Sequence, residues 1–244
     1  MMSKKLLIIV GLFIVGMVGG IFADQIFWPY FIERPLFYQY RLEKNPVYLT
    51  ETKEIYIQEN TALMDVIEKV EKTIVGVKTK TKYGKILQGS GLIVTSDGLM
   101  VTLAELVPQG STFSFFLDGK AVSFQILKRD LEENLALLKI SDSSLSTAGF
   151  ASLDRLKIGE RVFLLGIVFG SVEDEVQQLE KSVNEGIIKT FNQDSIETSI
   201  TETGLLAGSP LFNIKGEILG LNTIDAKGNV SAIPITKIKA FMGM

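Results

Sequence analysis

The amino-acid sequence predicts an all-β protein preceded by an N-terminal membrane-spanning helix. From residue 73 onward, short segments rich in β-branched and aromatic residues alternate with turn pairs such as Asp118-Gly119 and Lys215-Gly216. Few stretches in that part repeat apolar residues at helical spacing. The first 23 residues instead contain one long apolar run. Many short strands with few helices indicate a barrel or a sandwich, and strand spacing alone does not choose between the two.

The apolar run covers residues 6–23, carries no charge and follows Lys4 and Lys5. About 18 helical residues span most of a ~30 Å hydrocarbon core, so a transmembrane signal-anchor helix is expected. The two lysines predict a cytoplasmic N-terminus and an extracytoplasmic remainder. A cleaved signal peptide is the alternative. It is disfavoured because the −3 residue before a cut after Ala23 would be Ile21, which is not small.

The segment after the apolar run is predicted to connect the membrane to the β domain. Residues 24–60 contain three prolines and no helical period, which indicates a membrane-proximal connector. An interfacial aromatic belt is expected at its start, at Trp28, Tyr30 and Phe31. Residues 61–72 place apolar side chains at helical spacing after Thr61, a good N-cap, and therefore predict a short amphipathic helix.

The β region is predicted to contain short strands throughout. Expected strand ranges are 74–77, 87–95, 100–102, 113–117, 122–126, 135–140, 162–166, 186–191, 196–200, 218–223 and 230–235. The acidic and polar stretch 170–185 is interpreted as a solvated loop.

Composition excludes several classes of function. The net charge is −3 and basic residues are mixed with acidic ones, so no nucleic-acid partner is expected. The sequence has neither cysteine nor histidine, which argues against a transition-metal site. No Asp-x-Asp-x-Asp-Gly calcium loop occurs either. We therefore expect no cofactor and no metal.

Four ordered motifs between residues 62 and 242 resemble HtrA (Deg)-type trypsin-like serine proteases. They are Gly-Ser-Gly-Leu-Ile-Val with Asp-Gly-Leu-Met-Val-Thr at 89–102, Asn-Leu-Ala-Leu-Leu-Lys-Ile at 134–140, Gly-Glu plus an apolar strand at 159–166, and the segment 201–223. The resemblance implies two six-stranded antiparallel β-barrels with short flanking helices. Within a domain at 61–244 these would be barrel 1 near 73–150, barrel 2 near 155–235 and a C-terminal helix at 236–242. No PDZ domain is expected after that helix.

The same alignment places the family's catalytic positions on residues that cannot perform its chemistry. The resemblance puts Glu105 at the histidine position, Asn134 at the aspartate position and Ala207 at the nucleophilic serine. Leu205 and Ala207 take the positions of the oxyanion-hole donors, and a leucine resists the positive φ that glycine allows. No catalytic residue is therefore expected. We further predict that the Asn134 amide donates a hydrogen bond to the Glu105 carboxylate.

These residues allow other interpretations. Glu105 could simply be a solvated carboxylate. A rearranged site could use Ser209 with Glu105 as its base, although a carboxylate is poorly matched in pKa to a serine hydroxyl. A serine–lysine dyad has no positional support from any candidate, namely Lys85, Lys189 or Lys215. By resemblance, the 170–185 stretch could instead shape a specificity pocket or contact a neighbouring subunit.

The resulting functional hypothesis is a membrane-anchored, extracytoplasmic pseudoprotease. The crevice between the barrels would bind polypeptides or envelope proteins, since adding a peptide as a strand needs no catalytic triad. Active HtrA-type protease subunits are alternative partners, and the resemblance implies a trimer. The membrane would be contacted through residues 6–23. An active trypsin-like endopeptidase with a rearranged site and a purely structural envelope protein are the competing hypotheses.

Overall fold

The computed structural model describes residues 4–33, 63–170 and 179–244, in two compact units. The first unit covers Met1–Ile57 and the second covers Gln58–Met244. The boundary predicted between residues 60 and 61, and the N-cap Thr61, lie outside the described residues.

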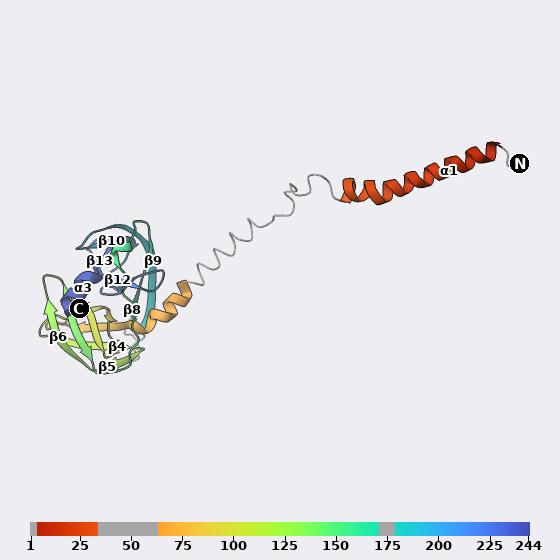
Figure 1. Ribbon diagram of the computed structural model, residues 1–244. Coiled ribbons are helices and arrows are strands. Elements are labelled where there is room, and N and C mark those ends of the chain that lie inside the picture. The colour runs from red at the N-terminus through yellow and green to blue at the C-terminus, as the bar shows by residue number, and fades with distance from the viewer. Residues whose placement is uncertain (1–3, 34–62, 171–178) are drawn as a thin grey trace. The chain divides into compact units, whose positions relative to one another are not determined.

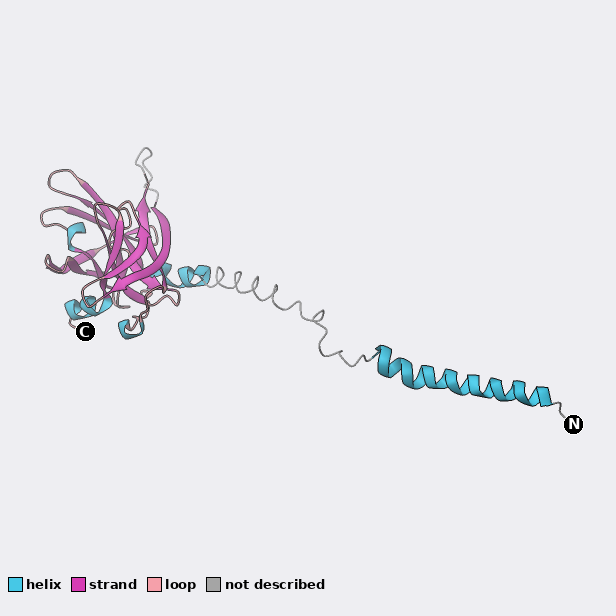
Figure 2. Ribbon diagram, turned by 90° about the horizontal axis from the view of Figure 1, so that it is seen from above, coloured by secondary structure: helices cyan, strands magenta, loops and turns pink. Residues whose placement is uncertain are grey.

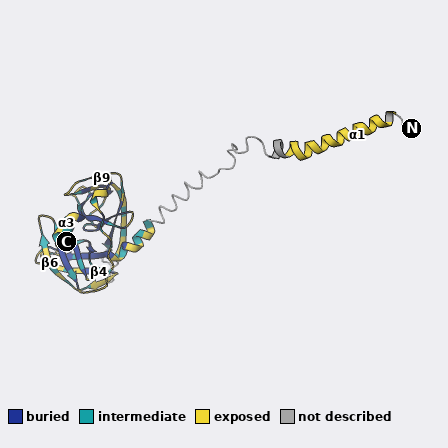
Figure 3. Ribbon diagram, viewed as in Figure 1, coloured by how far each residue is buried: buried dark blue, intermediate teal, exposed yellow. Residues whose placement is uncertain are grey.

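The described residues of the first unit, 4–33, are helical throughout. Helix α1 (Lys4–Phe22) continues directly into a π-helix, η1 (Ala23–Glu33). The stretch Leu6–Trp28 is long and apolar enough to cross a membrane, a test that a signal sequence near an N-terminus also passes. Its side chains are exposed, as Figure 3 shows by colour. The predicted helix is present and continues beyond residue 23, so residues 24–33 are helical although their sequence shows no helical period.

The second unit begins with the predicted short amphipathic helix. The helix covers described residues 63–70 and ends in a 3-10 turn, η4 (Glu71–Thr73). Val70 is fully buried and Met64 is exposed, so the helix presents one apolar face to the domain.

The rest of the second unit is built from antiparallel strands, drawn in magenta in Figure 2. Seven form one sheet in the order β5-β4-β1-β2-β3-β7-β6. Their bounds are β1 (Ile74–Lys80), β2 (Ile86–Ile93), β3 (Leu99–Leu103), β4 (Thr112–Leu117), β5 (Lys120–Val122), β6 (Phe124–Asp130) and β7 (Leu135–Ile140). Only Ser123 separates β5 from β6, although these strands lie at opposite edges of the sheet. The sheet therefore curls until one bent strand joins its two edges.

This geometry explains why seven strands appear where six were predicted. The sequence range 122–126 was expected to form a single strand. The bend at Ser123 divides it, because its first part pairs with β4 and its second part pairs with β7.

The remaining six strands close into a barrel in the order β10-β13-β12-β11-β8-β9. Their bounds are β8 (Arg161–Phe169), β9 (Leu179–Phe191), β10 (Ile196–Thr201), β11 (Pro210–Asn213), β12 (Ile218–Ile224) and β13 (Asn229–Pro234). Helix α3 (Ile235–Met242) follows and packs on β12 and β13 (Figure 1). The predicted all-β architecture with a C-terminal helix is confirmed.

Both faces of β8 are buried, and this joins the two halves of the domain. Val162 and Leu164 face the interior of the closed barrel, whereas Phe163, Leu165 and Ile167 belong to the core shared with the first sheet. This alternation is the two-residue period of a strand. The halves therefore pack through the outer face of the barrel as a single body.

Strand β9 is longer than predicted. Its first seven residues, 179–185, are polar and acidic and were interpreted as part of a solvated loop, which is wrong for these residues. They form a strand because the whole length of β8 pairs with β9, from Phe169↔Leu179 to Arg161↔Ile187. Residues 171–178 of the same predicted loop lie outside the described residues.

Candidate active site

The first predicted site residue, Glu105, lies at the centre of a short 3-10 helix, η5 (Ala104–Leu106), directly after β3. Ala104 and Leu106 are buried, whereas the Glu105 side chain is exposed. The Thr79 hydroxyl donates a hydrogen bond of 2.6 Å to the Leu106 carbonyl and fixes the end of the turn. Glu105 is therefore placed at the surface by two buried neighbours.

Asn134 holds this turn through two hydrogen bonds. The Ala104 N–H donates to the Asn134 carbonyl at 3.0 Å, and the Glu105 N–H donates to Asn134 Oδ1, also at 3.0 Å. Asn134 has φ +52, a left-handed conformation that asparagine adopts more readily than most residues. The structure thus brings the two predicted residues into contact.

The atoms involved differ from those predicted. We expected the Asn134 amide to donate to the Glu105 carboxylate, but the amide oxygen accepts from the Glu105 main chain. The first N–H groups of a helical turn have no partner within the turn, and Oδ1 satisfies one of them. The Glu105 side chain is exposed, and its carboxylate makes no hydrogen bond to any described residue.

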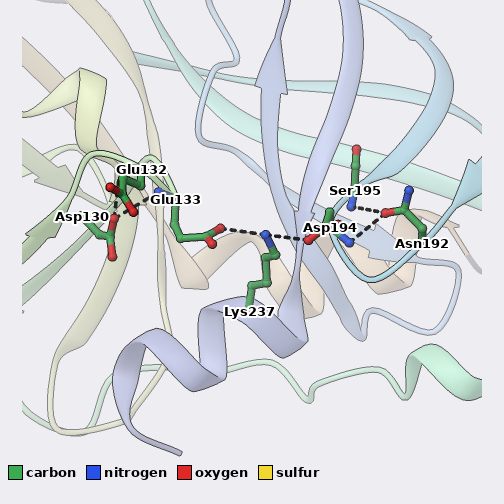
Figure 4. Close-up of polar contacts among 7 residues, drawn as sticks. All are labelled: Asp130, Glu132, Glu133, Asn192, Asp194, Ser195 and Lys237. Atoms are coloured by element: carbon green, nitrogen blue, oxygen red, sulfur yellow. Dashed lines mark hydrogen bonds and ion pairs between the residues drawn. The ribbon is translucent and has the colours of Figure 1, made fainter.

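The turn that carries Asn134 is itself held in place. Asp130 Oδ1 accepts N–H bonds from Glu132 and Glu133 at 3.0 and 3.1 Å. Lys237 on α3 contacts the Glu133 carboxylate and Asp194, both at 2.9 Å, and these bonds raise the pKa of Lys237. Figure 4 shows Lys237 reaching between the two turns. The C-terminal helix therefore connects the turn before β7 with the turn between β9 and β10.

Ala207 lies in a turn whose main chain bonds to itself and to the first sheet. The Ala207 N–H donates to the Gly204 carbonyl at 3.3 Å, and its carbonyl accepts from the Ser90 N–H at 2.8 Å. The next N–H group, of Gly208, donates to the Asn222 carbonyl at 3.1 Å. The main-chain N–H groups of Ala207 and Gly208 therefore both have hydrogen-bond partners inside the protein.

Leu205 adopts an ordinary backbone conformation. Among the described non-glycine residues, positive φ occurs at Asp118, Asn134 and Ser144, and the preceding Gly204 takes φ +95. The Leu205 side chain is 43% exposed. Whether an oxyanion donor at this position is misdirected stays a prediction.

A cavity of about 850 Å³ brings three predicted site residues together. Glu105, Leu205 and Ala207 line it; Asn134 lies behind Glu105 and is not part of its lining. Its opposite wall comes from the segment between β1 and β2 and the start of β2, including Lys85 and Gln88. Sequence reasoning did not assign these residues to the site, because no local pattern shows that this hairpin lies beside residues 203–207.

Ser209, the alternative nucleophile, is fully buried. Its hydroxyl makes no hydrogen bond within the described part of the chain. The hydroxyl packs so tightly on Gly166 that an added Cβ there would overlap it. A substrate carbonyl could not reach this oxygen without opening the packing between β8 and β11. Of the lysines considered, Lys85 lines the cavity, whereas Lys189 lies on β9 and Lys215 on the turn after β11.

Residues 4–33, 63–170 and 179–244 contain no group of three or more carboxylate, histidine or cysteine side chains that could hold a metal ion.

Comparison with known proteins identifies the family. A model described as a trypsin-like peptidase domain matches residues 89–221. A probable periplasmic serine endoprotease, DegP-like, of Rhizobium meliloti is 30% identical over 170 residues, which are 62% of this chain and 32% of that protein. Serine protease HTRA1A of Danio rerio is 28% identical over 201 residues, 74% of this chain and 40% of that protein.

A solved structure agrees on the fold. An HtrA-type protease, AlgW, solved with a tripeptide, superimposes with a TM-score of 0.64 at 22% identity, over 74% of this chain and 62% of that one. The chain spans about a third of the length of the curated bacterial relatives it matches. It belongs to the trypsin-like peptidase domain family and is an HtrA-type member of it.

Proposed function

We propose that this protein is a membrane-anchored pseudoprotease, which binds polypeptide segments in the cavity beside Glu105 and Ala207 without cleaving them. The observation that carries the proposal is the turn 204–208, where the nucleophile position holds a methyl group and the Ala207 N–H is bonded to Gly204. Hydrolysis in this family requires an attacking hydroxyl and a free donor for the developing oxyanion.

The other groups near the cavity do not replace the missing chemistry. The sequence has no histidine. Glu105 is exposed, and Ser209 is buried under β8. A base and a nucleophile must lie within hydrogen-bond reach of one another and of the substrate. An exposed carboxylate and a fully buried hydroxyl do not meet that requirement.

The cavity itself supports binding. Its lining combines apolar side chains, Ile86, Leu87 and Leu205, with polar ones, Lys85, Gln88 and Glu105. An open, mixed surface of this kind suits an extended polypeptide, which offers both side chains and main-chain hydrogen bonds.

The location forms part of the same proposal. The helix Leu6–Trp28 would anchor the protein, with Lys4 and Lys5 on the cytoplasmic side and the β domain outside. Several curated relatives are described as periplasmic, which is consistent with an envelope location.

The test of inactivity uses the full chain in detergent micelles. We expect no labelling by a serine-reactive fluorophosphonate probe and no turnover of casein. Casein turnover or probe labelling that is abolished in Ser209→Ala would overturn the proposal and establish the rearranged endopeptidase instead.

The test of binding uses fluorescently labelled, unfolded casein and fluorescence anisotropy. We expect saturable binding that weakens by about tenfold, or about 1.4 kcal/mol, in Leu205→Ser, because a bound polypeptide would cover the exposed part of the Leu205 side chain. Leu131→Ser is the matched control, since Leu131 is 80% exposed and does not line the cavity. Absence of any binding would favour a purely structural envelope protein. An equal loss of casein affinity in both variants would show that the cavity is not the binding site.

A further inference from the structure

A second groove lies on the closed barrel, away from the cavity that holds Glu105. One wall is the segment 150–160, and the other is the turn 213–217 between β11 and β12. The groove has a volume of about 770 Å³, and none of the triad-equivalent or oxyanion-hole-equivalent residues lines it. Its floor is apolar, because Ala151, Leu156 and Leu219 are buried beneath it.

Each wall of the groove ends in a tight turn that exposes an isoleucine. The Glu160 N–H donates to the Lys157 carbonyl at 3.1 Å, which places Ile158 in one turn. The Gly216 N–H donates to the Asn213 carbonyl at 2.9 Å, which places Ile214 in the other. Turns usually carry glycine, proline or polar residues at such positions. Yet Ile158 is 69% exposed and Ile214 is 51% exposed, and both line the groove.

The carboxylates and the cationic side chains of the groove differ in the contacts that they make. Its two carboxylates have partners: Glu160 accepts the Lys157 N–H at 3.2 Å, and Glu217 accepts the Asn213 amide at 2.8 Å. Its three exposed cationic side chains form no ion pair within the described part of the chain: Arg155, Lys157 and Lys215. The two carboxylates keep their charge because their partners are neutral N–H groups, so three cations against two carboxylates give the groove a formal charge of +1 in a chain whose net charge is −3.

From this arrangement we infer that the groove docks an extended segment of a partner protein in which apolar side chains alternate with acidic ones. The isoleucines and the buried floor would contact the apolar side chains, since burial of exposed apolar surface drives such association. The unpaired cations would face the carboxylates and complement their charge. The inference does not depend on whether the Glu105 cavity is catalytic.

Peptide binding by the full chain in detergent micelles tests the inference. The probe is a fluorescein-labelled, capped peptide of alternating leucine and glutamate, and its matched control replaces every glutamate with lysine. We expect saturable binding of the acidic peptide, weakened by added salt because charge attraction is screened. Binding of the lysine peptide is expected to be at least about tenfold weaker. Equal binding of the two peptides would overturn the inference.

Paired substitutions locate the binding. Ile158→Ser with Ile214→Ser, and separately Lys157→Glu with Lys215→Glu, are each expected to weaken binding of the acidic peptide by about tenfold or more. All four residues are exposed turn residues, so thermal unfolding should change little. Leu131→Ser is the control and should leave this binding unchanged, because Leu131 is 80% exposed and lines neither the groove nor the Glu105 cavity. Unchanged binding in both double variants, or an equal loss in Leu131→Ser, would refute the assignment.

A second copy of the chain is the competing occupant. Sedimentation of the full chain at increasing concentration distinguishes it. Self-association that disappears in Ile158→Ser with Ile214→Ser would show that the groove joins copies of this chain, and would overturn the partner-segment inference. Sedimentation that is unaffected by these substitutions supports it.

Discussion

Strand β11 is buried, whereas the turn 204–208 just before it carries an exposed leucine. Leu211 and Phe212 are fully buried, and the Phe212 ring stacks on Phe163 with centroids 5.3 Å apart. Leu205, in contrast, is 43% exposed beside the cavity. Packing restricts the residue types that β11 tolerates, whereas at an exposed position such as Leu205 only binding or catalysis would restrict them. A trypsin-like framework can therefore persist around a site that has changed its chemistry.

The largest expected effect contrasts the two regions directly. Phe212→Ala should lower the free energy of unfolding by about 3–5 kcal/mol, because it leaves a cavity in the shared core. Leu205→Ala should change it by less than about 0.5 kcal/mol, as is usual for exposed positions. Chemical denaturation of the full chain in detergent measures both. Similar losses for the two variants would contradict the comparison.

A second experiment asks whether the framework still supports the family's reaction. The triple variant Glu105→His, Asn134→Asp, Ala207→Ser is expected to remain nearly inactive. Adding Leu205→Gly should raise casein turnover by about 10²–10³-fold, the usual contribution of one oxyanion donor. Strong activity in the triple variant alone would show that Leu205 does not impair the site.

A third pair of variants tests how closely the turn is held against the first sheet. Gly208 has φ +73, and a Cβ there would lie 2.5 Å from the Ser90 carbonyl oxygen. Gly110 has a similar φ of +77 but nothing within 4 Å. Gly110→Ala should therefore cost only the left-handed strain, about 1–2 kcal/mol. Gly208→Ala should cost about 1–3 kcal/mol more, from overpacking. Equal losses of unfolding free energy in denaturant titrations would mean that Gly208 does not pack closely against the Ser90 carbonyl.

The smallest expected effect concerns Lys237 and depends on pH. Its contacts with Glu133 and Asp194 raise its pKa in the folded protein. The stabilisation is therefore complete below the ordinary lysine pKa and is lost as pH rises through the raised value. Lys237→Met should lower the thermal midpoint slightly at neutral pH and have no effect at strongly alkaline pH. Lys120→Met, at an exposed lysine with no ion pair in the described residues, is the control.

Much of the fold followed from local sequence patterns. The uncharged run at 6–23 predicted α1, and the β-rich segments predicted most strands to within a few residues. The first half of β9 was missed because residues 179–185 look like a polar loop in isolation. Their strand conformation comes from pairing with β8. The helix beyond residue 23 was likewise missed, since its proline and polar residues disrupt a helical pattern.

The sequence predicted which residues stand at the candidate site but not how they contact one another. The sequence by itself determined which residues stand at 105, 134, 205 and 207, and hence that no histidine or serine occupies the resembling positions. Only the tertiary structure decided that Asn134 binds the Glu105 main chain, that Ser209 is buried and that Lys85 lines the same cavity. The physical reason is distance along the chain, because these contacts join residues far apart in sequence. Pairing of β3 with β7 brings Asn134 to Glu105, pairing of β8 with β11 buries Ser209, and packing of the two halves brings Lys85 to the cavity.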